Sequence, residues 1–151
     1  MSKPVPADHA GAVPYLAVRN ATAALDFYKT AFGARELLRI GDERVIGHAE
    51  IAIGGAVVML SDEFPERDVL SPASIGGTPV VIHLYVEDVD AFTEQAVAAG
   101  LKTLRPVADQ FYGDRGGKFE DPYGHRWWIA THKEDVAPDE LKRRAAALFG
   151  E

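Results

Sequence analysis

The sequence predicts an α+β protein made of two tandem βαβββ modules, followed by a short C-terminal helix. Two repeated features carry this prediction. A short apolar strand followed by an amphipathic helix occurs twice, about 67 to 68 residues apart, and a glycine ends each helix, Gly33 in the first and Gly100 in the second. A pair of apolar segments beginning at Gly55 and Gly124 repeats at an offset of about 69 residues. Because helical and alternating patterns recur in the same order, each half reads as one copy of the same unit.

The first module is predicted over residues 13–61. Its first strand begins near Val13, and Asn20 is a good N-cap for a helix whose apolar residues keep returning to one face. Gly33 supplies the left-handed C-cap of that helix. Gly54-Gly55 is a two-residue hairpin signal. The strands after the helix are predicted over residues 35–40, 44–53 and 56–61.

Residues 62–78 contain prolines and glycines with little periodicity, so we interpret them as a linker between the modules. The second module, residues 79–131, repeats the plan of the first. Its helix is predicted over residues 88–99, and its strands over 80–86, 102–107, 117–120 and 125–131. In the tail, residues 132–151, Pro138 begins an amphipathic helix. Residues 1–12 form a flexible extension, and the whole chain is expected to be one domain.

Composition sets the outer bounds on function. A chain of 151 residues with 47% hydrophobic residues can bury one domain-sized core, and its longest apolar runs are far too short to span a bilayer. No signal peptide is recognisable, so a cytoplasmic protein without a membrane partner is expected. The absence of cysteine removes thiolate nucleophiles and thiolate metal ligands. A net charge of −7 argues against a nucleic-acid partner.

Several motifs occur in a recognisable order and spacing. They are Pro14-Tyr15-Leu16-Ala17-Val18, Asp26-Phe27-Tyr28-Lys29 with Phe32-Gly33-Ala34, His48-Ala49-Glu50, the run Met59 to Pro65, and Asp114-Arg115 with the run Glu120 to Trp127. Over residues 13–131 the chain thereby resembles the glyoxalase/bleomycin-resistance group of the vicinal oxygen chelate superfamily, and within it the PhnB-like branch. The resemblance implies concave mixed sheets that face each other around a cavity, often in a homodimer. Because this scaffold hosts unrelated chemistries, the resemblance alone assigns no activity.

The superfamily's enzymes hold a divalent metal with four side chains, one from the first and one from the last strand of each module. The aligned positions in this sequence are Val13, Met59, Val81 and Trp128. Hard and borderline divalent ions need carboxylate oxygen or imidazole nitrogen, which none of these side chains offers. The resemblance therefore implies that no metal cofactor occupies the usual centre, and that ordinary metal-dependent glyoxalase activity is absent.

Strand alternation indicates what lines the cavity instead. If Gly54-Gly55 forms the hairpin, Glu50 pairs with Met59 and His48 with Ser61, and these four side chains share one face. Since the alignment marks Met59 as facing the cavity, all four are expected to do so. The second module contributes His83, Tyr85, Arg126 and Trp128. Such an aromatic lining with polar tips suits a flat or partly apolar organic ligand.

The glycine-rich segment from Gln110 to Gly117 is interpreted as a flexible loop at the cavity entrance. It would be either a lid that brings Tyr112 and Arg115 to the ligand or a loop held by an ion pair between Asp114 and Arg115. The cavity residues have structural alternatives as well. Glu50 would be satisfied by Arg126 or Arg115, His48 would bond to Ser61, and His83 would be a core histidine.

Three functional hypotheses follow. The first is a module that binds or sequesters a small organic molecule without turnover. The second is an enzyme of the lyase, isomerase or dioxygenase type. It would use either a divalent metal relocated to His48, Glu50 and His83, or one of these three residues as a metal-free general base. The third is a catalytically inert dimeric scaffold whose cavity is filled by its own side chains.

Overall fold

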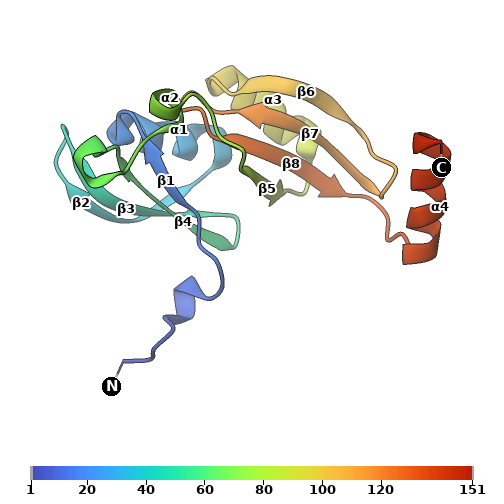
Figure 1. Ribbon diagram of the computed structural model, residues 1–151, viewed down its shortest axis with the longest axis horizontal. Coiled ribbons are helices and arrows are strands. Elements are labelled where there is room, and N and C mark those ends of the chain that lie inside the picture. The colour runs from blue at the N-terminus through green and yellow to red at the C-terminus, as the bar shows by residue number, and fades with distance from the viewer. Residues whose placement is uncertain (1, 151) are drawn as a thin grey trace.

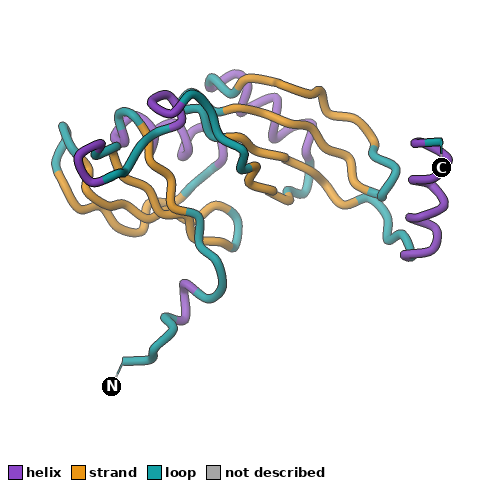
Figure 2. The backbone as a smooth tube through the Cα atoms, viewed as in Figure 1, coloured by secondary structure: helices purple, strands orange, loops and turns teal. Residues whose placement is uncertain are grey.

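The computed structural model describes residues 2–150, which form two four-stranded mixed sheets placed side by side (Figures 1 and 2). In the first sheet the strand order is β1-β4-β3-β2, and in the second it is β5-β8-β7-β6. The strands are β1 (Tyr15–Val18), β2 (Arg35–Gly41), β3 (Ile46–Ile53), β4 (Ala56–Asp62), β5 (Val81–Tyr85), β6 (Lys102–Asp109), β7 (Asp114–Glu120) and β8 (Arg126–His132). The two sheets have the same topology, which confirms the predicted α+β fold with two βαβββ modules.

Each module carries one long helix, with α1 (Ala21–Phe32) in the first and α3 (Val89–Ala99) in the second. The side chain of Asn20 caps α1 by accepting from the backbone N–H of Ala23, and Gly33 ends the helix at a φ of 66°. The linker contains the single turn of α2 (Pro72–Ile75), and the tail forms α4 (Pro138–Phe149). Figure 1 shows α4 standing apart at the end of β8. No helix within residues 2–150 is long and apolar enough to cross a membrane.

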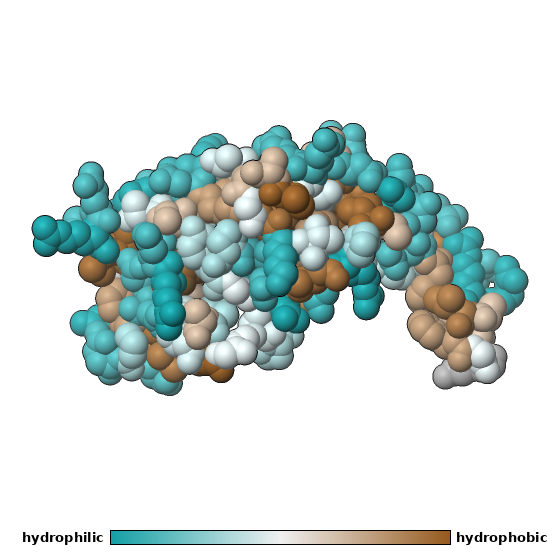
Figure 3. Space-filling view, turned by 90° about the horizontal axis from the view of Figure 1, so that it is seen from above, coloured by the Kyte–Doolittle hydropathy of each residue, from teal (hydrophilic) through white to brown (hydrophobic). Residues whose placement is uncertain are grey.

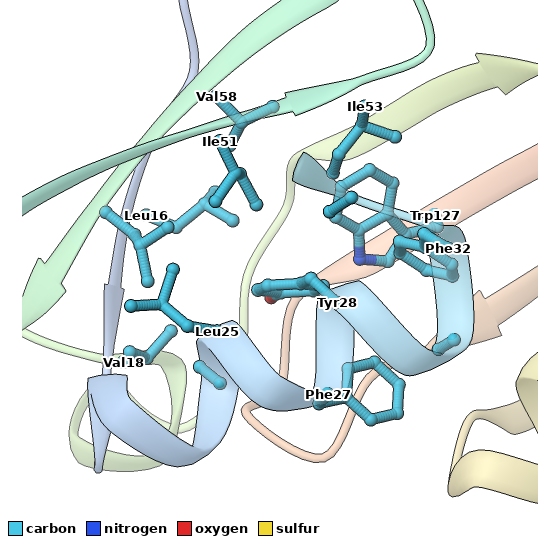
Figure 4. Packing of buried hydrophobic residues seen from close by; sticks show 14 of the residues in the cluster. Leu16, Val18, Leu25, Phe27, Tyr28, Phe32, Ile51, Ile53, Val58 and Trp127 are labelled. Atoms are coloured by element: carbon cyan, nitrogen blue, oxygen red, sulfur yellow. The ribbon is translucent and has the colours of Figure 1, made fainter. Parts of the chain in front are cut away.

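The core lies between the sheets and the two long helices, which also pack against each other. Tyr28 and Phe32 project from α1 toward Trp127 of β8, so the two modules share one aromatic cluster (Figure 4). Tyr28 and Trp127 are almost completely buried. This aromatic cluster connects the two sheets through the faces that the helices cover. The opposite face of each sheet, which no long helix covers, is called its open face.

Strand β7 corrects the prediction at one place. It begins at Asp114, not at Gly117, so the turn after β6 is limited to residues 110–113. Gly116 and Gly117 are strand residues that pair with Ala130 and Ile129. Glycine fits at Gly116 because an added Cβ would lie 2.8 Å from the indole Nε1 of Trp128. The local ion pair between Asp114 and Arg115 is also wrong, since Arg115 pairs with Asp90 and Asp109.

Candidate functional site

The open face of the first sheet carries the predicted polar residues of β3. Burial alternates along this strand, with Ala49 and Ile51 in the core and His48 and Glu50 partly buried on the other side. Glu50 lies opposite Met59 in the register of β3 and β4, as the Gly54-Gly55 hairpin predicted. A strand with one face against α1 therefore presents its histidine and carboxylate on the open face.

Four side chains on this face form a continuous hydrogen-bonded cluster. Nε2 of His48 lies 2.7 Å from one carboxylate oxygen of Glu50, and Nε2 of His9 lies 2.6 Å from the other. The hydroxyl of Tyr15 lies 2.8 Å from Nδ1 of His48. With its proton on Nε2, a neutral His48 donates to Glu50 and accepts from Tyr15, so that this chain of contacts is satisfied.

The cluster changes the acidity of its carboxyl group. Hydrogen bonds, first from His48 and then from His9, lower the pKa of Glu50 below its ordinary value of 4.5, and burial opposes this shift only partly. Glu50 is therefore a carboxylate at neutral pH. Its partners differ from those predicted: His9 and His48 bond to it, and neither Arg126 nor Arg115 does.

The remaining predicted residues of the first module have separate places. Ser61 is buried and its hydroxyl donates to the backbone carbonyl of Asp62, so the predicted bond to His48 is wrong. Met59 lies in β4 between Glu50 on one neighbouring strand and Tyr15 on the other. Its thioether therefore lies in the middle of the first sheet, next to the polar cluster.

The second sheet has a pocket of about 420 Å³ on its open face, which we call the second-sheet pocket. Its lining residues are His83, Arg105, Gln110, Phe111, Tyr112, Trp128, Leu148 and Phe149. His83 of β5 lies opposite Trp128 of β8, and both line the pocket. The last turn of α4 forms one wall, where Phe149 meets Phe111 edge to face at a centroid distance of 5.9 Å.

The wall of this pocket is held by specific contacts. Arg144 of α4 donates to the backbone carbonyl of Phe111 at 3.1 Å and pairs with Glu134 at 2.6 Å. Gln110 donates to the carbonyl of Ala108. Burial raises the pKa of Tyr112, and the charge of Asp114 raises it further. The pocket is thus shaped by a fixed turn and a docked helix.

Tyr85 belongs to a second polar cluster beside this pocket. Its hydroxyl donates to Asp114 at 2.7 Å, and the other oxygen of Asp114 lies 2.7 Å from Nδ1 of His132. Nε2 of His132 reaches Asp135 at 2.7 Å. The two carboxylates, Asp114 first, raise the pKa of His132. This cluster holds the segment that connects β8 to α4.

Neither of the two predicted arginines lines the second-sheet pocket or bonds to the polar cluster around Glu50. Arg115 turns toward α3, where its guanidinium makes two hydrogen bonds with Asp90, and Asp109 holds it as well. Arg126 lines a cleft of about 560 Å³ between β1 and β5 and lies 3.4 Å from Glu120. Val13 and Val81 also line this cleft, so its walls are largely apolar.

The side chains present do not fit the metal that the fold family implies. Val13, Val81 and Met59 offer no hard donor, and Trp128 has only an indole N–H, which cannot coordinate. Within residues 2–150 no group of three or more His, Cys, Asp or Glu side chains is placed to hold a metal ion. His48 and Glu50 lie on the first sheet and His83 on the second, so one chain does not gather them at a common point.

Three candidate residues escaped the sequence reasoning. His9 gave no periodic signal, because it lies in a Pro-rich and Ala-rich segment and reaches Glu50 only through the 3-10 helix Ala7–His9. The position of Lys118 could have been predicted. If the antiparallel pairing of β7 and β8 is counted outward from the turn between Asp121 and His125, Lys118 falls opposite Trp128. The position of Arg105 could not have been predicted in this way, because register shifts interrupt the pairing of β6 with β7 on both sides of it.

Comparison with known proteins gives matches over most of the chain. The model of the Glyoxalase/Bleomycin resistance protein/Dioxygenase superfamily matches residues 7–129. An uncharacterized protein of Mycobacterium bovis is 42% identical over 133 residues, which cover 85% of this chain and 88% of the relative. The crystal structure of TioX from Micromonospora sp. ML1 has a TM-score of 0.65 at 29% identity and covers 81% of this chain and 99% of TioX. The X-ray structure of a gene product from Arabidopsis thaliana has a TM-score of 0.66 at 27% identity, and the match covers 80% of this chain and 98% of that chain.

Proposed function

The chain belongs to the glyoxalase/bleomycin resistance protein/dioxygenase superfamily, and from that membership we propose that it binds a small, partly apolar organic molecule in a cavity that has lost the usual metal ligands. One observation carries the proposal. Trp128, which stands where the family alignment sets a metal ligand, forms part of an aromatic pocket with His83 and Tyr112. A flat indole surface beside a few polar tips supports binding of an organic ring system better than it supports an ion.

The proposal includes a homodimer. Apolar and aromatic side chains on the open faces are strongly exposed, with Ile40 at 56% and Tyr85 at 57%. Exposed apolar surface of this kind marks an interaction site. A second copy that lays its second sheet over the first sheet would cover these residues and enclose the cavity, in the arrangement that the family resemblance implies.

The binding function is tested with N-phenylnaphthylamine, a neutral fluorophore with two aromatic groups, titrated into untagged protein. We expect saturable binding, weakened about fivefold in Trp128→Leu, because loss of an aromatic contact removes on the order of 1 kcal/mol. Phe64→Leu, which removes an aromatic ring from the linker, is the matched control and should bind as the natural chain does. Absence of saturable binding would overturn the proposed function.

A metal-free enzyme is the second candidate, and one observation favours it. Tyr15, His48 and Glu50 form a chain of hydroxyl, imidazole and carboxylate at 2.8 and 2.7 Å. This is the arrangement in which a carboxylate orients an imidazole that takes a proton from a hydroxyl. Tyr15 is 49% exposed and also lines the cleft between β1 and β5, which supports access of a substrate to this residue.

The two candidates are separated by incubating the protein with any molecule that displaces the fluorophore and following product formation by NMR. Simple binding gives no product. The enzyme hypothesis gives product that is lost in Glu50→Gln while the melting temperature is retained. Elemental analysis of untagged protein, followed by titration with nickel, zinc, manganese and iron(II), checks the metal-dependent variant. In that variant a second copy would have to supply His83, and near-stoichiometric metal lost in His48→Ala would support it.

A further inference from the structure

We infer that the molecule bound in the second-sheet pocket is an anion, with a flat apolar body over Trp128 and a carboxylate, sulfonate or phosphate group held by Arg105 and Lys118. This inference rests on the proposed function and narrows its ligand class. It concerns two cations that the sequence reasoning did not include in the site.

The register of the second sheet sets four side chains in one row across its open face. His83 lies opposite Trp128, Trp128 opposite Lys118, and Lys118 opposite Arg105, so the row runs through β5, β8, β7 and β6 in turn. Side chains directly opposite each other on neighbouring strands have Cβ atoms about 5 Å apart. The strand pairing therefore sets the aromatic ring of Trp128 next to the two positively charged residues Lys118 and Arg105.

The two charges have no protein counterion in the part of the chain that is described. Neither Arg105 nor Lys118 makes an ion pair there, although the chain as a whole carries a net charge of −7. The acidic groups nearest along the sheet are already engaged: Glu120 pairs with Arg126, and Asp109 pairs with Arg115. Asp114 bonds to Tyr85 and His132. Like charges directly opposite on a sheet repel, and an anion between them removes that repulsion.

Local structure supports a ligand role for Arg105. It lines the pocket together with Trp128 and Tyr112, and β6 is an edge strand that is irregular on both sides of it. Bulges of this type re-aim side chains and are common beside functional sites. Lys118 is partly buried and lies opposite Trp128 in the register of β7 and β8, next to two residues of the pocket lining, Trp128 and Arg105. In Figure 3 the C-terminal helix projects from the molecule with an apolar patch near its end, and this end supplies Leu148 and Phe149 to the pocket wall.

The test compares two fluorophores with the same ring system, neutral N-phenylnaphthylamine and anionic anilinonaphthalene sulfonate, titrated into the full-length protein. We expect the sulfonate to bind more tightly and its affinity to fall with added salt. In the double variant Arg105→Gln/Lys118→Gln the ratio of the two affinities should fall by about tenfold or more, because both charges that hold the anionic group are removed. The matched control Lys3→Gln/Arg44→Gln changes the net charge equally at two exposed positions and should leave that ratio unaltered.

Each outcome decides the inference. A ratio that falls in the pocket variant and not in the control supports it. The inference is overturned if the ratio is unaltered in the pocket variant or falls equally in the control. In that case, binding of the neutral fluorophore still supports the proposed function. If neither fluorophore binds, the proposed function and this inference are both wrong. Near-ultraviolet circular dichroism of every variant verifies that the aromatic core is intact.

Discussion

The hydroxyl of Tyr28 donates to the carboxylate of Asp121 at 2.5 Å, across 93 residues of sequence and across the boundary between the two modules. The same carboxylate oxygen accepts from the indole of Trp127 at 3.0 Å, and its other oxygen accepts from the backbone N–H groups of Tyr123 and His125. Asp121 is almost fully buried. A buried carboxylate with four donors is a rigid joint, and it fixes how the two sheets sit relative to each other.

Replacing Tyr28 by phenylalanine should lower the free energy of unfolding by about 1–3 kcal/mol, because a buried carboxylate loses one of its donors. Urea denaturation followed by tryptophan fluorescence measures this. Tyr123→Phe removes a hydroxyl that makes no hydrogen bond within residues 2–150 and is the matched control. Equal stability of the two variants would show that the joint contributes nothing through this bond.

Gly116→Ala should destabilise the protein by about 1–3 kcal/mol and move the Trp128 indole, because the new Cβ would lie 2.8 Å from both Nε1 of Trp128 and Cβ of Ala130. Thermal denaturation and the near-ultraviolet dichroism of the tryptophans report the two effects. At Gly55 an added Cβ has open space, so Gly55→Ala is the control. If Gly116→Ala is as stable as that control, the close approach of Gly116 to Trp128 and Ala130 is contradicted.

Loss of His9 should raise the pKa of Glu50 toward its ordinary value of 4.5, because one of the two hydrogen bonds that lower it is removed. Since the folded-state pKa is depressed, this carboxylate stabilises the fold above about pH 4.5, and its contribution is lost as the pH falls through the lowered pKa. Carbon-13 NMR of the Glu50 carboxyl in His9→Ala measures the shift. His48→Ala should raise the pKa more, because the bond from His48 is the larger cause.

His132 should titrate above its ordinary pKa of 6.5, and Asp114→Asn should lower that pKa more than Asp135→Asn does. The raised pKa means that the stabilisation is complete below about pH 6.5 and is lost as the pH rises through the folded-state value. Proton NMR of the imidazole gives the pKa, and thermal melts across this range give the stability. A His132 pKa that is indifferent to Asp114→Asn would contradict the hydrogen bond at 2.7 Å.

The proposed homodimer should show a mass of about twice 16.4 kDa by light scattering after size exclusion. Ile40→Glu should shift the protein toward the monomer, because a charge on the open face of the first sheet would have to be desolvated in the interface. Val97→Glu, at an exposed position of α3, is the control. A natural chain that is monomeric at all concentrations would contradict the dimer.

The fold followed from local patterns. The caps at Asn20 and Gly33, the hairpin at Gly54-Gly55 and the repeat between halves were enough to predict two βαβββ modules and the pairing of β3 with β4. Strand alternation also grouped His83 with Tyr85 and Arg126 with Trp128 as residues sharing a strand face. These features depend on residues close in sequence or on a period of two, and both can be read without coordinates.

The tertiary structure alone decided how charged and polar groups are paired. It brings His9 to Glu50, joins Tyr28 to Asp121 and turns Arg115 toward Asp90. It also makes α4 a wall of the second-sheet pocket and sets Arg105 beside Trp128. A long polar side chain pairs with whichever group the packing of distant segments brings within about 3 Å. The sequence by itself determined the two-module fold and the faces of the strands, whereas only the packed chain determined the pairs His9–Glu50, Tyr28–Asp121 and Arg115–Asp90, because the partners in these pairs are separated by tens of residues and meet only after the sheets and helices have packed.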